Sequence, residues 1–139
     1  MDRILIDTDV ILDFFFDREP FSDFASEVLE KCETGEIKGF TTAVIISNVY
    51  YLLNKVAKHQ IVIEKLRQLT SIVDIVDVDK KVVIEALNSK FKDFEDALQN
   101  YAAENAGVEI ILTRNTKDYK NSRLAVLTPE MYLRGKAGY

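Results

Sequence analysis

The stretch Arg3-Ile4-Leu5-Ile6-Asp7-Thr8-Asp9-Val10-Ile11-Leu12-Asp13 decides the fold of this 139-residue chain. Its apolar run, residues 4–6, predicts a strand that is buried on both faces, as is typical of a parallel sheet. Asp7 and Asp9 follow at the carboxyl end of that strand. In open α/β sheets, ligands bind in the crevice outside the carboxyl ends of the strands. Because Mg²⁺ takes oxygen ligands, Asp7 is a candidate metal ligand whose partner carboxylates should lie elsewhere in the chain.

The composition is that of a globular protein, with 47% hydrophobic residues, and we expect a single domain over residues 1–139. No apolar run approaches the roughly 18 residues of a membrane span, and the N-terminus lacks the pattern of a signal peptide. We therefore expect no membrane association and a cytoplasmic location. Cys32 is the single cysteine, which excludes an intrachain disulfide and favours a small buried packing residue.

The net charge of −5 is unevenly distributed along the chain. Residues 114–139 carry six basic and two acidic side chains, a net charge of +4, so residues 1–113 carry −9. This asymmetry is compatible with an acidic metal pocket beside a basic rim that holds phosphates. Chance clustering on a solvated surface is the alternative.

Strand patterns alternate with helix patterns, which predicts an α/β fold: three α/β/α layers around a central parallel sheet of about five strands. Strands are expected at residues 4–6, 38–41, 72–76, 109–113 and 124–127. Seven helices are expected. The first four are expected from about residue 10 to 16, from an N-cap at Ser22 to Gly35, from an N-cap at Thr42 to Lys58, and over 61–69. The last three are expected from an N-cap at Asp79 to Leu87, from Asp93 to Gly107 and from Pro129 onward.

Two further acidic sites follow later in the chain. In Asp93-Phe94-Glu95-Asp96, a spacing of three turns Asp93 and Asp96 to one side of a helix while Glu95 turns aside. Acidic residues there can instead cap the helix and complement its dipole. Asp118 follows the 109–113 strand, where an Asp can also be a simple turn residue. Three carboxylates at one sheet edge would repel each other unless they are protonated or bridged by a cation such as Mg²⁺ or Mn²⁺.

These motifs resemble the PIN-domain family, the small metal-dependent nucleases that include the VapC-type toxins, over essentially the whole chain. Asp7-Thr8-Asp9 after its strand resembles the family's first motif. Asp93-Phe94-Glu95-Asp96-Ala97-Leu98 resembles its central acidic helix start, and Leu112-Thr113-Arg114-Asn115 with Lys117-Asp118-Tyr119 resembles its late motif. The resemblance implies an endoribonuclease that uses Mg²⁺ or Mn²⁺, acts on RNA, pairs with a small antitoxin protein and forms a homodimer.

Carried over to this sequence, the resemblance places catalysis and metal binding on Asp7, Asp96 and Asp118, with Asp93 as an auxiliary metal ligand. It makes Thr113 and Asn115 polar supports of the pocket. The basic residues nearest to these motifs, Arg114 and Lys117, are candidate contacts to RNA phosphates. Three tyrosines could stack on unpaired bases or simply pack in the core: Tyr50, Tyr51 and Tyr119.

Asn48 departs from the family pattern, which usually has a Glu on this helix. Asn48 can still offer a carbonyl oxygen, but a ligand set with less negative charge should bind Mg²⁺ more weakly. Either Asp93 or Asp9 partly compensates, or this chain binds metal poorly and cuts slowly. The second possibility leads to an alternative function, a PIN-like module that binds RNA or a partner protein with weak or lost catalysis.

A second alternative is a phosphatase of the haloacid-dehalogenase type, because Asp7-Thr8-Asp9-Val10-Ile11 resembles the opening motif of that family. Ile11 stands where Thr or Val is usual there, and no suitable Lys follows a second strand. Cys32 and His59 lie far from the acidic motifs, so we expect no protein nucleophile. The apolar stripe of the 42–58 helix, flanked by two tyrosines, can serve as core or as a partner surface.

Overall fold

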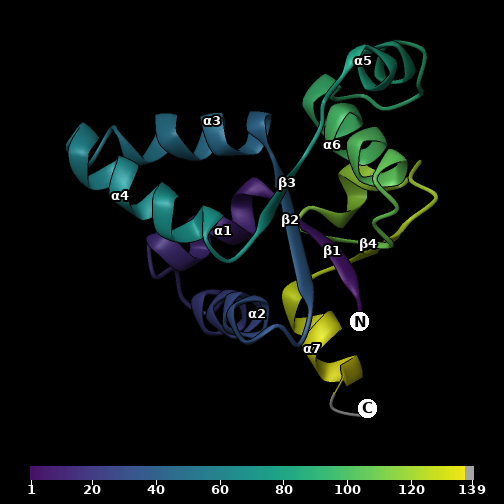
Figure 1. The fold of residues 1–139 in the computed structure, drawn as a ribbon. Coiled ribbons are helices and arrows are strands. Elements are labelled where there is room, and N and C mark those ends of the chain that lie inside the picture. Colours follow the sequence, from purple (N-terminus) through teal and green to yellow (C-terminus); the bar gives the residue numbers. More distant parts are fainter. Residues whose placement is uncertain (137–139) are drawn as a thin grey trace.

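The centre of the molecule is a parallel sheet of five strands in the order β3-β2-β1-β4-β5 (Figure 1). A computed structural model describes residues 1–136 of the chain. Its strands are β1 (Arg3–Ile6), β2 (Lys38–Thr42), β3 (Asp74–Val76), β4 (Ile110–Leu112) and β5 (Ala125–Leu127). The predicted three-layer α/β/α architecture around a parallel sheet is confirmed.

β1 is the middle strand of this sheet, as its apolar run predicted. Its residues 4–6 are at most 1% exposed. Leu5 aligns with Phe40 of β2 on one side and with Ile111 of β4 on the other. A strand with neighbours on both edges and helices on both faces has no wet side, which is why an uninterrupted apolar run suits it.

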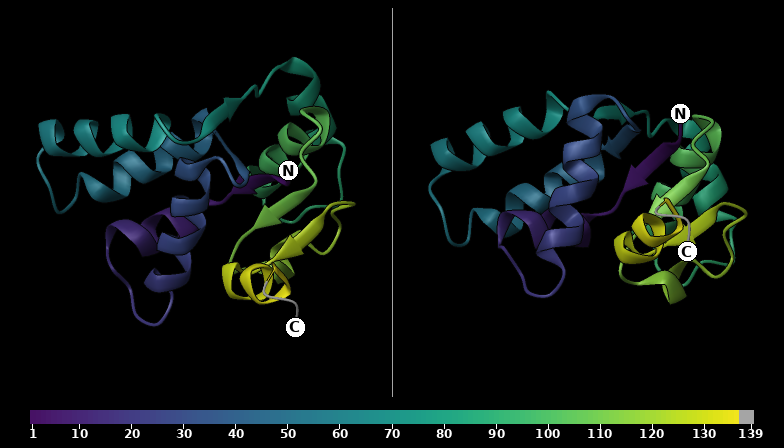
Figure 2. Two further views of the ribbon diagram at one scale, coloured as in Figure 1. Left: turned by 60° about the horizontal axis from the view of Figure 1, so that its bottom comes forward. Right: turned by 90° about the horizontal axis from the view of Figure 1, so that it is seen from below.

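Helices cover both faces of the sheet. They are α1 (Thr8–Phe15), α2 (Ser22–Thr34), α3 (Ala43–Leu53), α4 (His59–Thr70), α5 (Lys80–Leu87), α6 (Phe94–Asn105) and α7 (Pro129–Lys136), with a 3₁₀ turn, η1, at Thr116–Tyr119. Figure 1 shows α1, α3 and α4 on one side of the sheet and α5 and α6 on the other. Both views of Figure 2 keep α1 to α4 apart from α5 and α6. None of the helices within residues 1–136 has the length and apolar character needed to cross a membrane.

Three helix N-caps were predicted correctly from side-chain type and position. The Thr42 hydroxyl accepts a hydrogen bond from the Ile45 N–H (3.1 Å), and Asp79 accepts one from Val82 (3.1 Å). Asp93 accepts one from the Asp96 N–H (2.9 Å). Each bond satisfies a backbone donor that the first helical turn leaves free.

The first two helices begin at other residues than predicted. α1 begins at Thr8 rather than near residue 10, because Asp7 is its N-cap and accepts a hydrogen bond from the Thr8 N–H at 2.8 Å. Ser22 is not the N-cap of α2; Phe21 holds that position. The chain already turns before Ser22, whose N–H donates to the Arg18 carbonyl at 2.7 Å.

The α3–α4 connection and β3 also differ from the predicted ranges. α3 ends at Leu53 rather than Lys58, and α4 begins at His59 rather than Ile61. The side-chain amide of Asn54 donates to the Ala57 carbonyl (3.2 Å) and so holds a turn between the two helices. β3 starts at residue 74 rather than 72, because the N–H groups of residues 72 and 73 both donate to the Leu69 carbonyl and close the turn after α4.

The fold brings the carboxyl ends of β1 and β4 side by side. The two strands are in register, with Ile6 beside Leu112. Asp7 continues this pairing, since its N–H donates to the Leu112 carbonyl at 3.0 Å. The loop that follows β4 therefore starts next to Asp7, as expected for a site at the carboxyl edge of a parallel sheet.

Gly39 of β2 lies where the sheet meets α2, and its packing predicts a cost for any side chain. A Cβ there would lie 2.6 Å from the Sγ of the buried Cys32 and 3.0 Å from Cγ1 of Val73. We expect Gly39→Ala to lower the free energy of unfolding by about 1–3 kcal/mol, the usual cost of overpacking a core. Urea unfolding measures the change. Gly135→Ala is the control, because a Cβ at Gly135 meets nothing within 4 Å; equal stability of both variants would contradict the prediction.

Candidate functional site

A cavity of about 560 Å³ opens at the carboxyl edge of the sheet and is lined by acidic side chains from three separate segments. Among its walls are five aspartates: Asp7, Asp9, Asp93, Asp96 and Asp118. Asn48 of α3 and Asn115 of the loop after β4 also line it. The structure thus brings to one cavity all the carboxylates that sequence reasoning singled out.

Asp7 lies at the junction of β1 and α1 and has two hydrogen-bonding partners. Its Oδ1 accepts from the Thr8 N–H, and its Oδ2 accepts from the Tyr119 hydroxyl at 3.3 Å. Burial, and to a lesser extent the charge of Asp9, raises the pKa of Asp7 to about 6, although hydrogen bonds from Thr8, Thr113 and Tyr119 oppose the shift. Asp7 is therefore a carboxylate held in a place where its negative charge is costly.

Asp9 connects α1 to the loop after β4. Its Oδ2 accepts three hydrogen bonds, from the Thr113 hydroxyl (3.3 Å), the Arg114 N–H (3.0 Å) and the Asn115 side-chain amide (3.1 Å). Burial still raises the pKa of Asp9. Its Oδ1 is buried and has no hydrogen-bond partner among the described residues. Thr113 and Asn115, predicted as polar supports, hold Asp9 in place.

Asp96 lies in the first turn of α6. Burial and the charges of Asp93, Asp7 and Asp118, in that order, raise the pKa of Asp96 to about 7. The aspartates from β1, α6 and η1 are thus close enough to repel each other. Asp93 combines two roles, because it caps α6 and also lines the cavity.

Glu95 is a cavity residue that sequence reasoning set aside wrongly. Its Oε2 accepts a hydrogen bond from the Asn48 side-chain amide at 2.9 Å, and both residues line the cavity. The expectation that Glu95 would turn aside treated residues 93–96 as one helical face. Asp93 is the N-cap with extended backbone angles, so of these residues only 94–96 are helical. The Glu95 side chain, in the first turn of α6, reaches Asn48 of α3. The carboxylate that lies beside Asn48 is therefore Glu95, which α6 supplies.

Gln99 and Arg18 also belong to the site and were not identified from the sequence, whereas Tyr119 was expected either to stack on bases or to pack in the core. Tyr119 is 1% exposed, so it packs in the core while its hydroxyl reaches Asp7. Gln99 lines the cavity and accepts a hydrogen bond from Thr42 at 2.6 Å. The one available signal was the polar Gln99 beside the apolar residues of the α6 face. Nothing in the sequence around Arg18 indicated that it would reach the cavity.

Neither of the two predicted phosphate contacts, Arg114 and Lys117, lines the acidic cavity itself. The guanidinium of Arg114 forms a bidentate ion pair with Asp13 (2.7 and 3.0 Å), which is only 1% exposed, and so faces away from the acidic cavity. Lys117 lines a neighbouring hollow together with Lys92 and Lys120. Three of the site aspartates, Asp93, Asp96 and Asp118, form the shared wall between that hollow and the acidic cavity.

The donor chemistry of the cavity fits a hard divalent cation that keeps much of its water. Every candidate ligand is an oxygen atom, and the buried Oδ1 of Asp9 lacks a partner. In residues 1–136, no three carboxylate, imidazole or thiolate side chains are close enough together to coordinate one ion directly. Mg²⁺ is commonly held by one or two carboxylates with water filling the remaining positions, which is compatible with this spacing.

The raised pKa of Asp7 predicts how stability depends on pH when metal is removed. The folded protein keeps the Asp7 proton up to about pH 6, whereas the unfolded chain ionises near the ordinary value of 3.8. The contribution of Asp7 to the free energy of unfolding therefore falls as the pH rises from 3.8 to about 6. In EDTA at pH 7.5, Asp7→Asn, which can still cap α1, should raise the free energy of unfolding by about 1–3 kcal/mol.

Urea unfolding at pH 5 and pH 7.5 tests this expectation, with Asp77→Asn as the control because Asp77 is exposed and outside the cavity. The Asp77 variant should follow the wild type at both pH values. An Asp7→Asn variant that is no more stable than the wild type at pH 7.5 would show that burial of this charge costs nothing.

The Asn48–Glu95 contact predicts that an acidic residue at position 48 is unfavourable without metal. Asn48→Glu places two carboxylates within hydrogen-bonding distance, at a cost of about 0.5–1 kcal/mol for a partly exposed pair. We expect a lower melting temperature in EDTA. In a Glu95→Gln background the same substitution should cost little, because the Gln amide can donate. Thermal unfolding of the four proteins measures the coupling, and an equal loss in both backgrounds would exclude it.

Comparisons with known proteins agree with this geometry. The family model of the PIN domain matches residues 3–117. Ribonuclease VapC1 of Aquifex aeolicus is 26% identical over 136 residues, which cover 94% of this chain and 93% of that protein. A toxin–antitoxin complex from Klebsiella pneumoniae contains a chain with a TM-score of 0.69 and 23% identity, covering 91% of this chain and 97% of that chain. VapC20 of Mycobacterium tuberculosis, described as a sarcin–ricin-loop-cleaving toxin, gives a TM-score of 0.62 at 14% identity, with 78% of this chain and 86% of that chain covered. The chain belongs to the PIN-domain family.

Proposed function

We propose that this protein is a divalent-metal-dependent endoribonuclease that hydrolyses RNA phosphodiester bonds and is the toxin of a toxin–antitoxin pair. The observation that carries the proposal is the group of aspartates around one cavity, where burial and mutual repulsion raise the pKa values of Asp7 and Asp96. Such shifts are typical of functional sites. With the family established, the phosphatase interpretation of the first motif is set aside.

The carboxylates proposed to bind the metal, directly or through bound water, are Asp7, Asp96 and Asp118, with Asp93 as the auxiliary carboxylate. A bound Mg²⁺ or Mn²⁺ ion would supply an activated water molecule and would stabilise the negative charge that develops on the phosphate. The protein's own contribution is positioning. Tyr119 orients Asp7 through its hydroxyl, and Asp9 holds the loop that leads to η1, on which Asp118 lies.

Basic side chains on two sides of the acidic cavity support binding of an RNA backbone. The hollow lined by Lys92, Lys117 and Lys120 shares a wall with the cavity. Arg18 lines the cavity itself, and its Nη1 lies 3.5 Å from Asp13. Arg18 in the acidic cavity and the lysines of the neighbouring hollow would hold the phosphates that flank the one at the metal.

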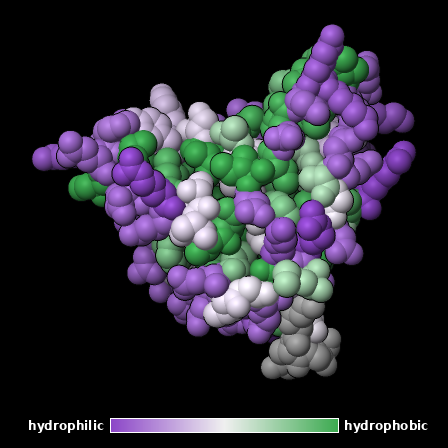
Figure 3. All heavy atoms as spheres, in the orientation of Figure 1, coloured by the Kyte–Doolittle hydropathy of each residue, from purple (hydrophilic) through white to green (hydrophobic). Residues whose placement is uncertain are grey.

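An antitoxin and a second copy of this chain are the proposed protein partners. The structural relatives from Klebsiella pneumoniae and Rickettsia felis are toxin–antitoxin assemblies. An RNA-cleaving protein would meet its antitoxin and its RNA in the cytoplasm, which is therefore the proposed location. Apolar side chains gather across the face of the molecule between α3 and α6 in Figure 3. Tyr51 in α3 is 66% exposed and Val56, just after α3, is 72% exposed, which suits contact with a partner.

A second candidate is a PIN-like module that binds RNA or a partner with weak or lost catalysis. Asn48, where the family usually has an acidic residue, favours this candidate. The carboxylates of residues 1–136 also do not converge as direct ligands of one ion. Metal binding separates the two candidates without any substrate, because an ion that binds the folded state raises the melting temperature.

The test of the proposed function is cleavage of a pool of structured and single-stranded RNAs with Mg²⁺ or Mn²⁺. We expect cleavage by the wild type, and none in EDTA. Asp7→Asn and Asp96→Asn should each reduce the rate by at least about 100-fold, the usual cost of removing one charge-stabilising group. Asp77→Asn, outside the cavity, should keep full activity.

A thermal-shift measurement with Mn²⁺ accompanies the cleavage assay. No cleavage together with an intact Mn²⁺ shift would mean a metal site that lacks its substrate in the pool. Absence of both cleavage and shift would favour the binding module. Cleavage that persists in EDTA, or that Asp7→Asn leaves unchanged, would overturn the assignment of these carboxylates.

A further inference from the structure

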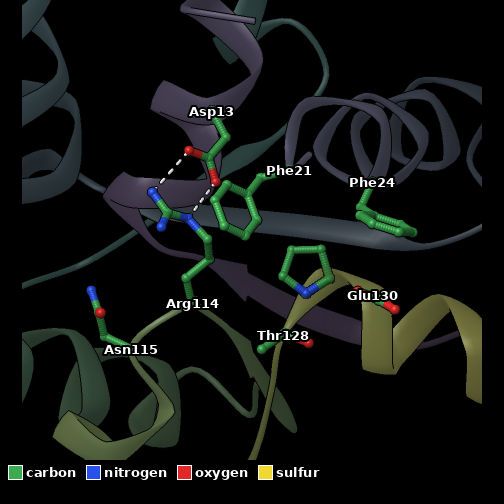
Figure 4. Close-up of a pocket in the computed structure, with 8 residues that line it drawn as sticks. Asp13, Phe21, Phe24, Arg114, Asn115, Thr128 and Glu130 are labelled. Carbon is green, nitrogen blue, oxygen red and sulfur yellow. Dashed lines mark hydrogen bonds and ion pairs between the residues drawn. The ribbon is translucent and has the colours of Figure 1, made fainter. Parts of the chain in front are cut away.

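A second, smaller cavity of about 220 Å³ lies beside the acidic cavity (Figure 4). Its walls come from the start of α2, the loop after β4 and the junction of β5 with α7, and they include Phe21, Phe24, Arg114 and Pro129. Asn115 lines both this cavity and the acidic one. An RNA strand bound across the aspartates of the acidic cavity would therefore bring its next nucleotide to this second cavity.

One wall of this cavity is a rigid stack of an arginine on a phenylalanine. The guanidinium of Arg114 lies 4.1 Å from the centroid of the Phe21 ring. Two hydrogen bonds from Arg114 to the buried Asp13 hold that guanidinium in place, as the dashed lines in Figure 4 show. Phe21 is 37% exposed although it is large and apolar. Flat, pre-ordered aromatic and guanidinium surfaces of this kind stack well on nucleobases.

The opposite rim of the cavity is polar and carries an acceptor. Glu130 lines the cavity, and its Oε2 forms an ion pair with Arg134 at 2.6 Å. A carboxylate has two oxygens and several acceptor positions, so Glu130 can accept a further hydrogen bond. Carboxylates recognise the exocyclic amino groups of bases, as in contacts to the N4 amino group of cytosine.

We propose that this cavity binds one unpaired nucleobase of the RNA, next to the phosphate at the carboxylates, and prefers a base that carries an exocyclic amino group. The proposal rests on the proposed ribonuclease function and adds a specificity subsite to it. Phe21 and Arg114 would supply the stacking wall, and Glu130 would supply the acceptor for the amino group.

The charges around this cavity favour a base over a phosphate as its occupant. The guanidinium of Arg114 is held by the buried Asp13, which Arg18 also approaches at 3.5 Å, and Glu130 at the rim is paired with Arg134. Arg114 is the cation on the wall of this cavity, and a phosphate would have to displace Asp13 to pair with it. A planar base, in contrast, needs stacking surfaces and a hydrogen-bond acceptor, and both are present.

The test compares binding of oligo(C) and oligo(U), each 12 nucleotides long, by fluorescence anisotropy in a Ca²⁺ buffer, with RNA integrity checked on a denaturing gel. Cytosine carries an amino group where uracil carries a carbonyl group. We expect the wild type to bind oligo(C) about 10-fold more tightly, in the range that a hydrogen bond between a base amino group and a carboxylate supplies. Phe21→Ala should remove this difference, chiefly by weakening oligo(C), and Phe21→Tyr should retain it.

Phe14→Ala is the matched control, because Phe14 is similarly exposed, at 39%, and lines a different hollow; it should behave as the wild type. Equal binding of the two oligonucleotides by the wild type, or a preference that survives Phe21→Ala, would overturn the base subsite. If the RNA pool is still cleaved in that case, the ribonuclease proposal stands without the subsite. Failure both to bind the oligonucleotides and to cleave the pool would overturn both. An effect of Phe21→Ala on protein-partner binding alone would assign the cavity to a partner protein instead.

Discussion

The contacts of Asp9 are the constraint on which the site depends. One carboxylate oxygen accepts hydrogen bonds from three successive residues of the loop after β4, including the backbone of Arg114. This fixes α1 against that loop and so places Asp7, at the helix start, opposite η1. The cost is a buried negative charge beside others, which raises the pKa of Asp9. The packing of β1 against its neighbours offsets the repulsion between these like charges, which would otherwise separate.

The sequence predicted the structure correctly where a feature depends on neighbouring residues alone. The apolar run before Asp7 predicted the central strand, and residue type and position identified Thr42, Asp79 and Asp93 as caps. The aspartates were predicted to share a cavity because parallel strands bring their carboxyl ends to one edge. These inferences needed only backbone direction and periodicity, and neither depends on how side chains are packed.

The contacts that sequence reasoning missed lie between residues far apart in the chain. Glu95 meets Asn48 only because α3 and α6 face each other across the cavity. The ion pair of Arg114, a candidate contact to RNA phosphates, with Asp13, 101 positions away, was not foreseen either. Element boundaries were missed for a different reason: short turn bonds, such as that of Asn54 to Ala57, decide where a helix ends. Side-chain pairing of this sort has no periodic signature.

The central position of β1 has a consequence for the order in which the molecule assembles. β1 lies near the start of the chain, but its neighbour β4 begins at residue 110 and Asp118 comes later still. On the ribosome, the first strand must wait for the last quarter of the chain before its second edge is paired, and such long-range pairing is slow. The acidic cavity therefore cannot exist in the growing polypeptide. A chain with this topology has no complete site until β4 and the residues of η1 have been synthesised and have reached β1.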